Sequence, residues 1–254
     1  MRVLLSNDDG VHAAGLRALA DAFEGDEVWV CAPDREQSAS SHAISLHRPL
    51  RLHEEAPRWY AVDGTPTDAV YVGMNLVLEG RWPDVMVSGV NHGPNLGNDV
   101  HYSGTVAAAM EAALLGVPAI AVSLASSPPH DFTQAARLAV ELARALVAVR
   151  PSRPVLLNVN VPPGRVRGWR LARLGKRTYG NEVVTKIDPR GRRYYWIGGE
   201  GGARYEDIPG SDCNAVFGEG VAAVSPLRLD WSHEGLVEEL GGWEIDGYHA
   251  ERAP

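Results

Sequence analysis

The chain begins MRVLLSNDDG (residues 1–10), an apolar run that ends in polar and acidic residues. The apolar part predicts a buried β-strand at residues 3–5. Apolar residues at helical spacing in residues 16–23 predict a helix, and residues 27–31 predict a second strand. This order of strand, helix and strand is a βαβ unit. The acidic loop follows the first strand and is therefore expected at the carboxyl edge of the sheet, where ligands of open α/β folds bind.

The same alternation continues and predicts an α/β fold with a mostly parallel, Rossmann-like sheet flanked by helices. The expected strands are residues 44–52, 59–62, 84–90, 118–124 and 154–159. The expected helices are residues 65–78, with Thr65 as N-cap and Pro66 in the first turn, 105–115 and 132–149.

The amino-acid composition changes after about residue 161, where Gly, Arg and Tyr become more frequent and the alternation of strands and helices weakens. Strands are expected at residues 171–174, 194–197 and 220–227, and a short helix with a tail at the C-terminus. We expect one domain over residues 1–254, with a core at about 1–160 and a β-rich extension at about 161–254. A projecting hairpin in the extension would favour pairing with another subunit.

The amino-acid composition limits the classes of function that the protein can have. The formal net charge of −8 argues against a general nucleic-acid surface, although one metal ion can still bring a phosphorylated small molecule to an acidic site. The two cysteines, Cys31 and Cys213, lie in no metal or redox spacing. No secretory signal and no apolar run of about 18 residues stands out. We therefore expect a cytoplasmic protein without a membrane partner.

Oxygen-bearing side chains follow three of the expected strands. They are Asp8 and Asp9, then Ser38, Ser40 and Ser41, then Asn91 and Asn95. In a parallel sheet these loops emerge at one edge, and their oxygen atoms suit Mg²⁺, Mn²⁺ or Ca²⁺ better than structural Zn²⁺. The alternative for the two aspartates is an ordinary turn with a helix N-cap.

A second polar cluster, Ser103-Gly104-Thr105, precedes an expected helix. Its backbone N–H groups and hydroxyls could hold a phosphate at the helix N-terminus, or its side chains could simply cap that helix. Four histidines also fall in or near the loops and are candidate acids or phosphate contacts, or plain solvated side chains. They are His12, His42, His92 and His101.

Together these segments resemble the SurE family, stationary-phase survival proteins that act as metal-dependent 5′(3′)-nucleotidases. The similar segments are LLSNDDGVHAAG (4–15), APDREQS (32–38), VDGTPTDAV (62–70), VSGVNHGPNLGNDVHYSGTVAAAMEA (87–112), VPAIAVSL (117–124), DPRGRRYYWIGG (188–199), GSD (210–212) and VAAVSPLRLD (221–230). The resemblance covers nearly the whole chain.

The resemblance implies one divalent ion per subunit, Mg²⁺ or Mn²⁺. The implied metal ligands are Asp8, Asp9, Ser38 and Asn91, and the implied substrate residues are Asn95, Ser103, Gly104 and Thr105. It also implies a Rossmann-like core, a β-hairpin and a C-terminal segment exchanged in homodimers or homotetramers. Two positions depart from the family pattern, since Ala14 stands where proline is common and Ala39 where glycine is common.

These features suggest that a metal-bound phosphate is attacked by water, with Asp9, or else Asp8, as base. The products would be a nucleoside and phosphate. An aspartyl-phosphate on Asp8 is the less favoured route, because a carboxylate that binds metal is a weaker nucleophile. The alternatives in function are a broad phosphatase that also cleaves polyphosphate and a nucleotide-binding regulatory module without turnover.

Overall fold

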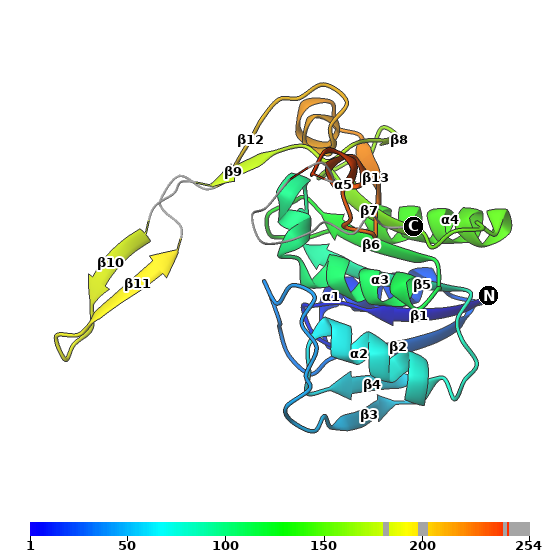
Figure 1. Ribbon diagram of the computed structural model, residues 1–254. Helices are drawn as coiled ribbons and strands as arrows, with labels where there is room; N and C mark the ends of the chain where they lie inside the picture. Colours follow the sequence, from blue (N-terminus) through cyan, green and yellow to red (C-terminus); the bar gives the residue numbers. More distant parts are fainter. Residues whose placement is uncertain (180–182, 198–202, 241–242, 244–254) are drawn as a thin grey trace.

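The core is a nine-stranded sheet with β1 (Arg2–Ser6) near its middle. The computed structural model describes residues 1–179, 183–197, 203–240 and 243 (Figure 1). The strand order is β3-β4-β2-β1-β5-β6-β7-β13-β8. The strands of the first two thirds are β2 (Glu27–Pro33), β3 (Leu52–Ala56), β4 (Trp59–Val62), β5 (Val85–His92), β6 (Ala119–Leu124) and β7 (Leu156–Val161). Across the sheet, each neighbouring pair in the row β4-β2-β1-β5-β6-β7 is parallel, which confirms the expected Rossmann-like sheet.

Helices cover both faces of this sheet. α1 (Ala14–Ala22) and α4 (Thr133–Val149) pack on one face, and α2 (Pro66–Val72) and α3 (Gly104–Leu114) lie together on the other (Figure 1). β1 shows how the sequence sets this arrangement, because successive side chains of a strand point to opposite faces. Val3 and Leu5 join the α1/α4 core, whereas Leu4 joins the α2/α3 core. A strand buried on both faces explains the continuous apolar run.

The expected helix at residues 65–78 is confirmed with one change of geometry. Thr65 and Asp68 form a reciprocal capping box, and Pro66 occupies the first turn. α2 then continues as a π-helix over Gly73–Val77. At Gly73 an added Cβ would lie 3.0 Å from Cβ of Cys31, so the small residue allows the helix to approach β2 closely.

The expected strand at residues 44–52 is wrong over most of its length. Only its last residue, Leu52, belongs to β3, an edge strand that pairs with β4 alone. Residues 44–51 run as an irregular loop, which the backbone N–H of Ser45 ties to the carboxylate of Asp68. Pro49 lacks a backbone donor and interrupts the apolar alternation, so the chain has little reason to pair there.

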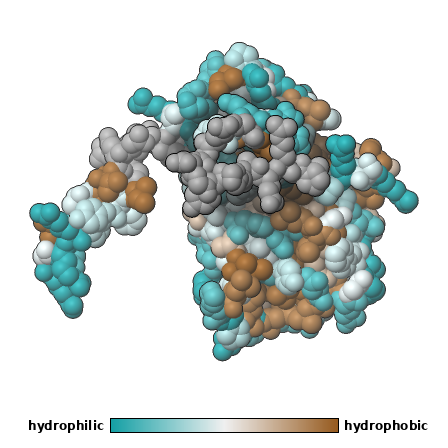
Figure 2. Space-filling model, viewed as in Figure 1, coloured by the Kyte–Doolittle hydropathy of each residue, from teal (hydrophilic) through white to brown (hydrophobic). Residues whose placement is uncertain are grey.

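The second half combines sheet strands with a projecting arm. β13 (Ala222–Leu227) returns to pair antiparallel with β7, and β8 (Trp169–Leu171) extends the edge. The arm starts at β9 (Arg177–Tyr179) and β12 (Ala203–Tyr205) and carries the hairpin of β10 (Val183–Ile187) and β11 (Arg193–Ile197). The hairpin projects from the body of the protein (Figure 1), and part of its surface is hydrophobic (Figure 2).

The expected projecting hairpin is therefore present, and β9, β10 and β12 are additional strands that the sequence did not indicate. The expected C-terminal helix corresponds to α5 (Glu234–Leu240), and most of the expected tail lies outside the described residues. Within the part of the chain that the structure describes, no helix is both long and apolar enough to cross a membrane.

Candidate metal and phosphate site

The first element of the site is the sharp turn after β1. The strand ends at Ser6, and the side chain of Asn7 donates to the carbonyl of Gly10 at 2.9 Å. Gly10 has φ +100°, and a Cβ there would lie 3.1 Å from the backbone of Arg35, so the turn requires glycine. Because the strand has already ended, Asp8 and Asp9 are not forced to opposite faces, and both line one cavity.

Asp8 is a buried carboxylate held from behind by α3. The Thr105 hydroxyl donates to its Oδ1 at 2.5 Å. A Cβ on Gly104 would lie only 2.7 Å from Cβ of Asp8, so the helix start packs directly on this side chain. Burial, and to a lesser degree the charge of Asp9, raises the pKa of Asp8 to about 6, although the bond from Thr105 acts in the opposite direction. A cation beside this carboxylate would offset that unfavourable burial.

Asp9 is less buried than Asp8. Its Oδ2 accepts a 3.3 Å bond from the backbone N–H of His92, and its Oδ1 is 3.5 Å from Nδ1 of the same residue. Burial raises the pKa of Asp9, while His92 opposes that shift. Asp9 is thus a carboxylate with more proton affinity than an exposed aspartate.

The loop after β2 brings Ser38 to the same cavity. The backbone N–H of Gln37 donates to the carbonyl of Asp8 at 2.8 Å, which fastens this loop to the first turn. The Ser38 hydroxyl donates to Oε1 of Glu36 at 2.7 Å. Ala39 has φ +57°, the left-handed region that favours glycine, so this loop keeps that conformation without the usual residue. The Ser40 hydroxyl is buried and has no hydrogen-bond partner among the described residues.

The long loop after β5 supplies Asn91 and Asn95. Asn91 donates from Nδ2 to the carbonyl of Gly93 at 2.8 Å. Asn95 is fixed by three polar side chains of neighbouring strands. Its backbone N–H donates to Asn160, its Nδ2 donates to Ser123, and its carbonyl accepts from Asn158 and Asn160. Sequence reasoning missed this support, and its signal was the pair of asparagines within the apolar strand β7.

Ser103 caps α3, as the simpler interpretation predicted. Its hydroxyl accepts from the backbone N–H of Val106 at 3.1 Å. Ser103 also lines the cavity with the aspartates, whereas Gly104 and Thr105 lie behind it and do not line it. The N-terminus of this 11-residue helix therefore reaches the cavity through Ser103.

The cavity has a volume of about 330 Å³. Six residues expected in the site line it together: Asp8, Asp9, Ser38, Asn91, Asn95 and Ser103. Among the described residues no group of three or more His, Cys, Asp or Glu could hold a metal ion. A cation here would therefore need the hydroxyl and amide oxygens as well as the two carboxylates. This oxygen-only set fits Mg²⁺ or Mn²⁺.

Of the four candidate histidines, only His92 lines this cavity. Its ring stacks on that of His130, with centroids 5.2 Å apart. Nε2 of His42 contacts Oε2 of Glu111 on α3 at 2.8 Å. His101 lines a different cavity, and His12 is exposed near Glu55.

Two further residues, which sequence reasoning missed, connect the arm to the loop after β5. The Arg177 guanidinium pairs with Asp99 and lines the cavity, and its backbone N–H donates to Asn98 at 2.8 Å. Asp212 is fully buried, and its carboxylate accepts from the backbone N–H groups of Gly97 (2.9 Å), Gly175 (2.7 Å) and Cys213 (2.8 Å). The start of the arm thereby fixes the loop that carries Asn95.

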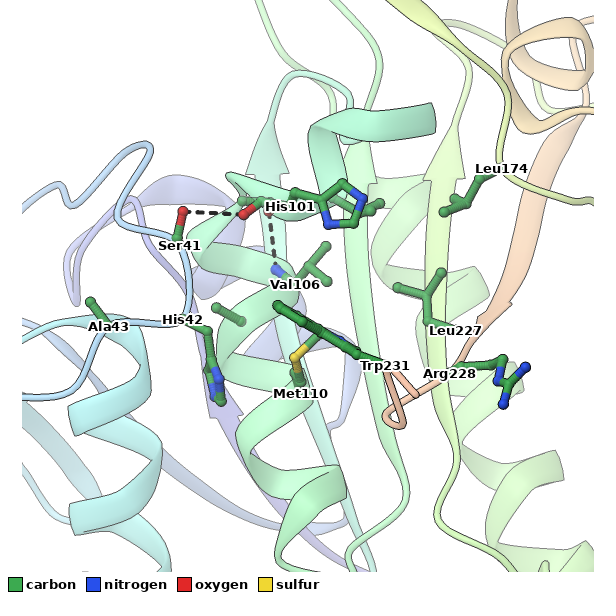
Figure 3. A pocket seen from close by; sticks show the side chains of 13 residues that line it. Ser41, His42, Ala43, His101, Val106, Met110, Leu174, Leu227, Arg228 and Trp231 are labelled. Atoms are coloured by element: carbon green, nitrogen blue, oxygen red, sulfur yellow. Dashed lines mark hydrogen bonds between the residues drawn. The ribbon is translucent and has the colours of Figure 1, made fainter. Parts of the chain in front are cut away.

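A more apolar cavity of about 420 Å³ runs along the outer side of α3. Met110 of α3 and Trp231, from the segment after β13, both point into it (Figure 3). Ser103 lines this cavity as well, so it begins near the candidate phosphate site and leads away from the sheet edge.

Comparison with known proteins gives one consistent result. The family described as Survival protein SurE matches residues 3–181. The 5′-nucleotidase SurE of Anaeromyxobacter sp. (strain K) is 76% identical over 254 residues, which is 100% of both chains. That of Myxococcus xanthus is 54% identical and covers 98% of this chain and 95% of its own. The crystal structure of the SurE protein from Aquifex aeolicus superposes with a TM-score of 0.83 at 36% identity, covering 94% and 98% of the two chains.

Proposed function

The chain belongs to the SurE family of survival proteins, and we propose that it is a 5′-nucleotidase whose activity depends on a divalent cation at the ends of β1, β2 and β5. The substrates are nucleoside 5′-monophosphates, and 3′-monophosphates are a second class to be tested. The products are a nucleoside and inorganic phosphate. The observation that carries the proposal is the convergence of one buried and one half-buried carboxylate, a hydroxyl and an amide on one cavity.

Asp8, Asp9, Ser38 and Asn91 would hold one Mg²⁺ or Mn²⁺ per subunit. When bound, the cation supplies positive charge to the phosphate and lowers the pKa of water. The raised pKa of Asp8 supports this assignment, because a carboxylate buried without a counter-ion gains most from a cation. Thr105 acts as a positioning residue, since its hydroxyl fixes one oxygen of Asp8.

Asn95 and Ser103 bind the phosphate from the side of the third loop. The hydrogen bonds that fix Asn95 to β6 and β7 support this role, because a preorganised donor loses little freedom on binding. Gly104 contributes indirectly, since its lack of a side chain lets the N-terminus of α3 approach Asp8. The helix dipole then favours the negative charge of the phosphate.

Asp9 is the general base in this scheme. It takes a proton from the attacking water, a bond forms from that water oxygen to phosphorus, and the bond from phosphorus to the ester oxygen breaks. The departing ester oxygen takes up a proton from solvent. Asp9 lines the same cavity as Asn95 and Ser103, which supports proton acceptance at this position. Attack by Asp8 itself is disfavoured, because the hydrogen bond from Thr105 and coordination to a cation would both make its carboxylate a weaker nucleophile.

The test is phosphate release from 5′-AMP and 5′-GMP by protein stripped with EDTA and then supplied with Mn²⁺ or Mg²⁺. Release that needs the cation supports the proposal. Nucleotide binding without release in any divalent cation would favour a regulatory module instead. A parallel assay with 3′-AMP and short polyphosphate separates a nucleotidase from a broad phosphatase.

The functional unit in this proposal is a homodimer or homotetramer. The hairpin supports it, because large hydrophobic side chains stand exposed on β10 and β11, with Ile197 95% exposed. The others are Val183, Ile187, Tyr194, Tyr195 and Trp196. We place the protein in the cytoplasm on the ground that Cys31 and Cys213 are both free thiols. No membrane or nucleic-acid polymer is required as a partner.

A further inference from the structure

A third cavity adjoins the candidate phosphate site at the carboxyl edge of the sheet. Its volume is about 520 Å³, which is ample for a nucleoside. Pro94 and Arg177 line both this cavity and the one that contains Asp8 and Asp9, so the two share a wall. A substrate with its phosphate beside the aspartates could therefore extend past these two residues into the third cavity.

One side of the third cavity is aromatic. The rings of Tyr205 and Phe217 have centroids 4.6 Å apart and are tilted by 37°. Phe217 is 49% exposed, so a face or edge of its ring is open to a ligand. The guanidinium of Arg177 lies 5.3 Å from the centre of the Tyr205 ring. Aromatic rings beside a guanidinium are a surface on which nucleobases stack.

Another side of the cavity is polar. The loop after β6 contributes the side chains of Ser126, Ser127 and Asp131. These groups offer hydrogen-bond acceptors, which are what the hydroxyl groups of a ribose require. The cavity thus combines a stacking surface with acceptors, in contact with a phosphate-sized site.

We propose that the third cavity holds the nucleoside of the substrate, with the base against the Tyr205–Phe217 pair and the ribose beside Ser126 and Asp131. This inference rests on the proposed function, since it assigns a place to one half of the same substrate. It makes Tyr205 and Phe217 the residues that favour nucleotides over other phosphate esters.

The apolar cavity along α3 is the competing location for the base, because Trp231 could stack on it. That cavity shares only Ser103 with the phosphate site. It also extends along the helix toward Met110 (Figure 3) rather than along the sheet edge. The third cavity, which shares two residues with the phosphate site and is formed by loops at that edge, is therefore the better match.

The experiment compares KM for 5′-AMP with KM for ribose 5-phosphate, which lacks the base, in the full-length protein with Mn²⁺. Phe217→Leu and Tyr205→Leu keep apolar volume and remove the ring. Each is expected to raise the ratio of KM for 5′-AMP to KM for ribose 5-phosphate about tenfold, the effect of one lost stacking contact. Phe217→Tyr restores a ring and is expected to restore the ratio. Tyr71→Ala removes a comparably exposed ring on α2, 45% exposed, and is expected to leave the ratio unchanged.

Trp231→Ala discriminates between the two cavities. If this variant shifts the ratio and the Tyr205 and Phe217 variants do not, the base lies along α3 and the proposal is wrong. An unchanged ratio in every variant also overturns it while leaving the nucleotidase proposal intact. Calorimetric titration with adenosine measures the affinity of the cavity for the nucleoside in the absence of turnover. Loss of adenosine binding in Phe217→Leu and its recovery in Phe217→Tyr would support the inference even if no phosphate were released, and equal binding by all variants would contradict it.

Discussion

Thr105 at the start of α3 donates a 2.5 Å hydrogen bond to Oδ1 of Asp8 at the end of β1. Thr105 has no exposed surface, and Asp8 is 6% exposed. The contact joins two elements 97 residues apart in sequence and orients a carboxylate that we assign to the cation. In metal sites, partners of this kind typically contribute 10- to 100-fold to metal affinity or activity.

Thr105→Val should therefore reduce Mn²⁺ affinity and phosphate release by about 10- to 100-fold, because valine keeps the shape and removes the donor. Thr105→Ser keeps the hydroxyl and should retain most of both. Mn²⁺ titration by calorimetry and steady-state assays with 5′-AMP measure the two effects. Equal affinity in the valine and serine variants would show that the hydrogen bond has no positioning role.

Asp8 should make the metal-free protein less stable as pH rises. Its folded-state pKa of about 6 lies above the ordinary value of 3.8, chiefly because of burial. The folded state therefore binds a proton more tightly than the unfolded state. The stabilisation from that proton is complete below pH 3.8 and is lost as pH rises through 6. The shift corresponds to about 3 kcal/mol at most.

Asp8→Asn isolates this contribution, since other carboxylates titrate in both proteins. In EDTA at pH 7, Asp8→Asn should be more stable to urea than the parent, and the difference should shrink by pH 4. Adding Mn²⁺ should make the parent the more stable of the two proteins at pH 7, because Mn²⁺ stabilises the folded parent and Asp8→Asn lacks a carboxylate that holds the ion. A difference that does not vary with pH would contradict the burial argument.

Asp212 should be a major stabilising residue. Three backbone N–H groups donate to its fully buried carboxylate, and removal of the carboxylate leaves them without that acceptor. Asp212→Ala should lower the free energy of unfolding by about 3 kcal/mol or more. Asp207→Ala, at an exposed carboxylate that accepts from Asn214, is the matched control and should lower it by less than about 1 kcal/mol. Urea denaturation monitored by circular dichroism compares the two.

The hairpin should control assembly. Ile197→Asp and Trp196→Asp place charge on a hydrophobic surface, and each should shift the sedimentation coefficient toward that of a smaller species. Arg190→Ser changes the exposed turn of the same hairpin and should leave the coefficient unchanged. If the aspartate variants sediment like the parent, assembly depends on another surface.

The sequence predicted the features that depend on local patterns. The strand, helix and strand of residues 1–33 and the N-cap at Thr65 followed from apolar spacing and turn chemistry, whereas the reciprocal bond to Asp68 was not predicted. The convergence of Asp8, Ser38 and Asn91 followed from the rule that parallel strands end at one edge.

The sequence did not predict features that depend on long-range contacts. Asp212 reaches Gly97 across 115 residues, and Arg177 reaches Asn98 across 79, and no local pattern indicates either partner. The loop at residues 44–51 resembled a strand because its apolar residues alternate. Hydrogen bonds to more distant residues hold it instead, from Ser45 to Asp68, 23 residues away, and from Arg51 to Asp63.

The most direct test of the account is phosphate release from 5′-AMP by the EDTA-stripped protein, with Mn²⁺ added back to the parent and to Asp8→Asn. We expect no release without a cation, recovery in the parent, and at most a few per cent of that recovery in Asp8→Asn at the same Mn²⁺ concentration. Full activity in EDTA, or equal recovery in the variant, would contradict a cation held by Asp8.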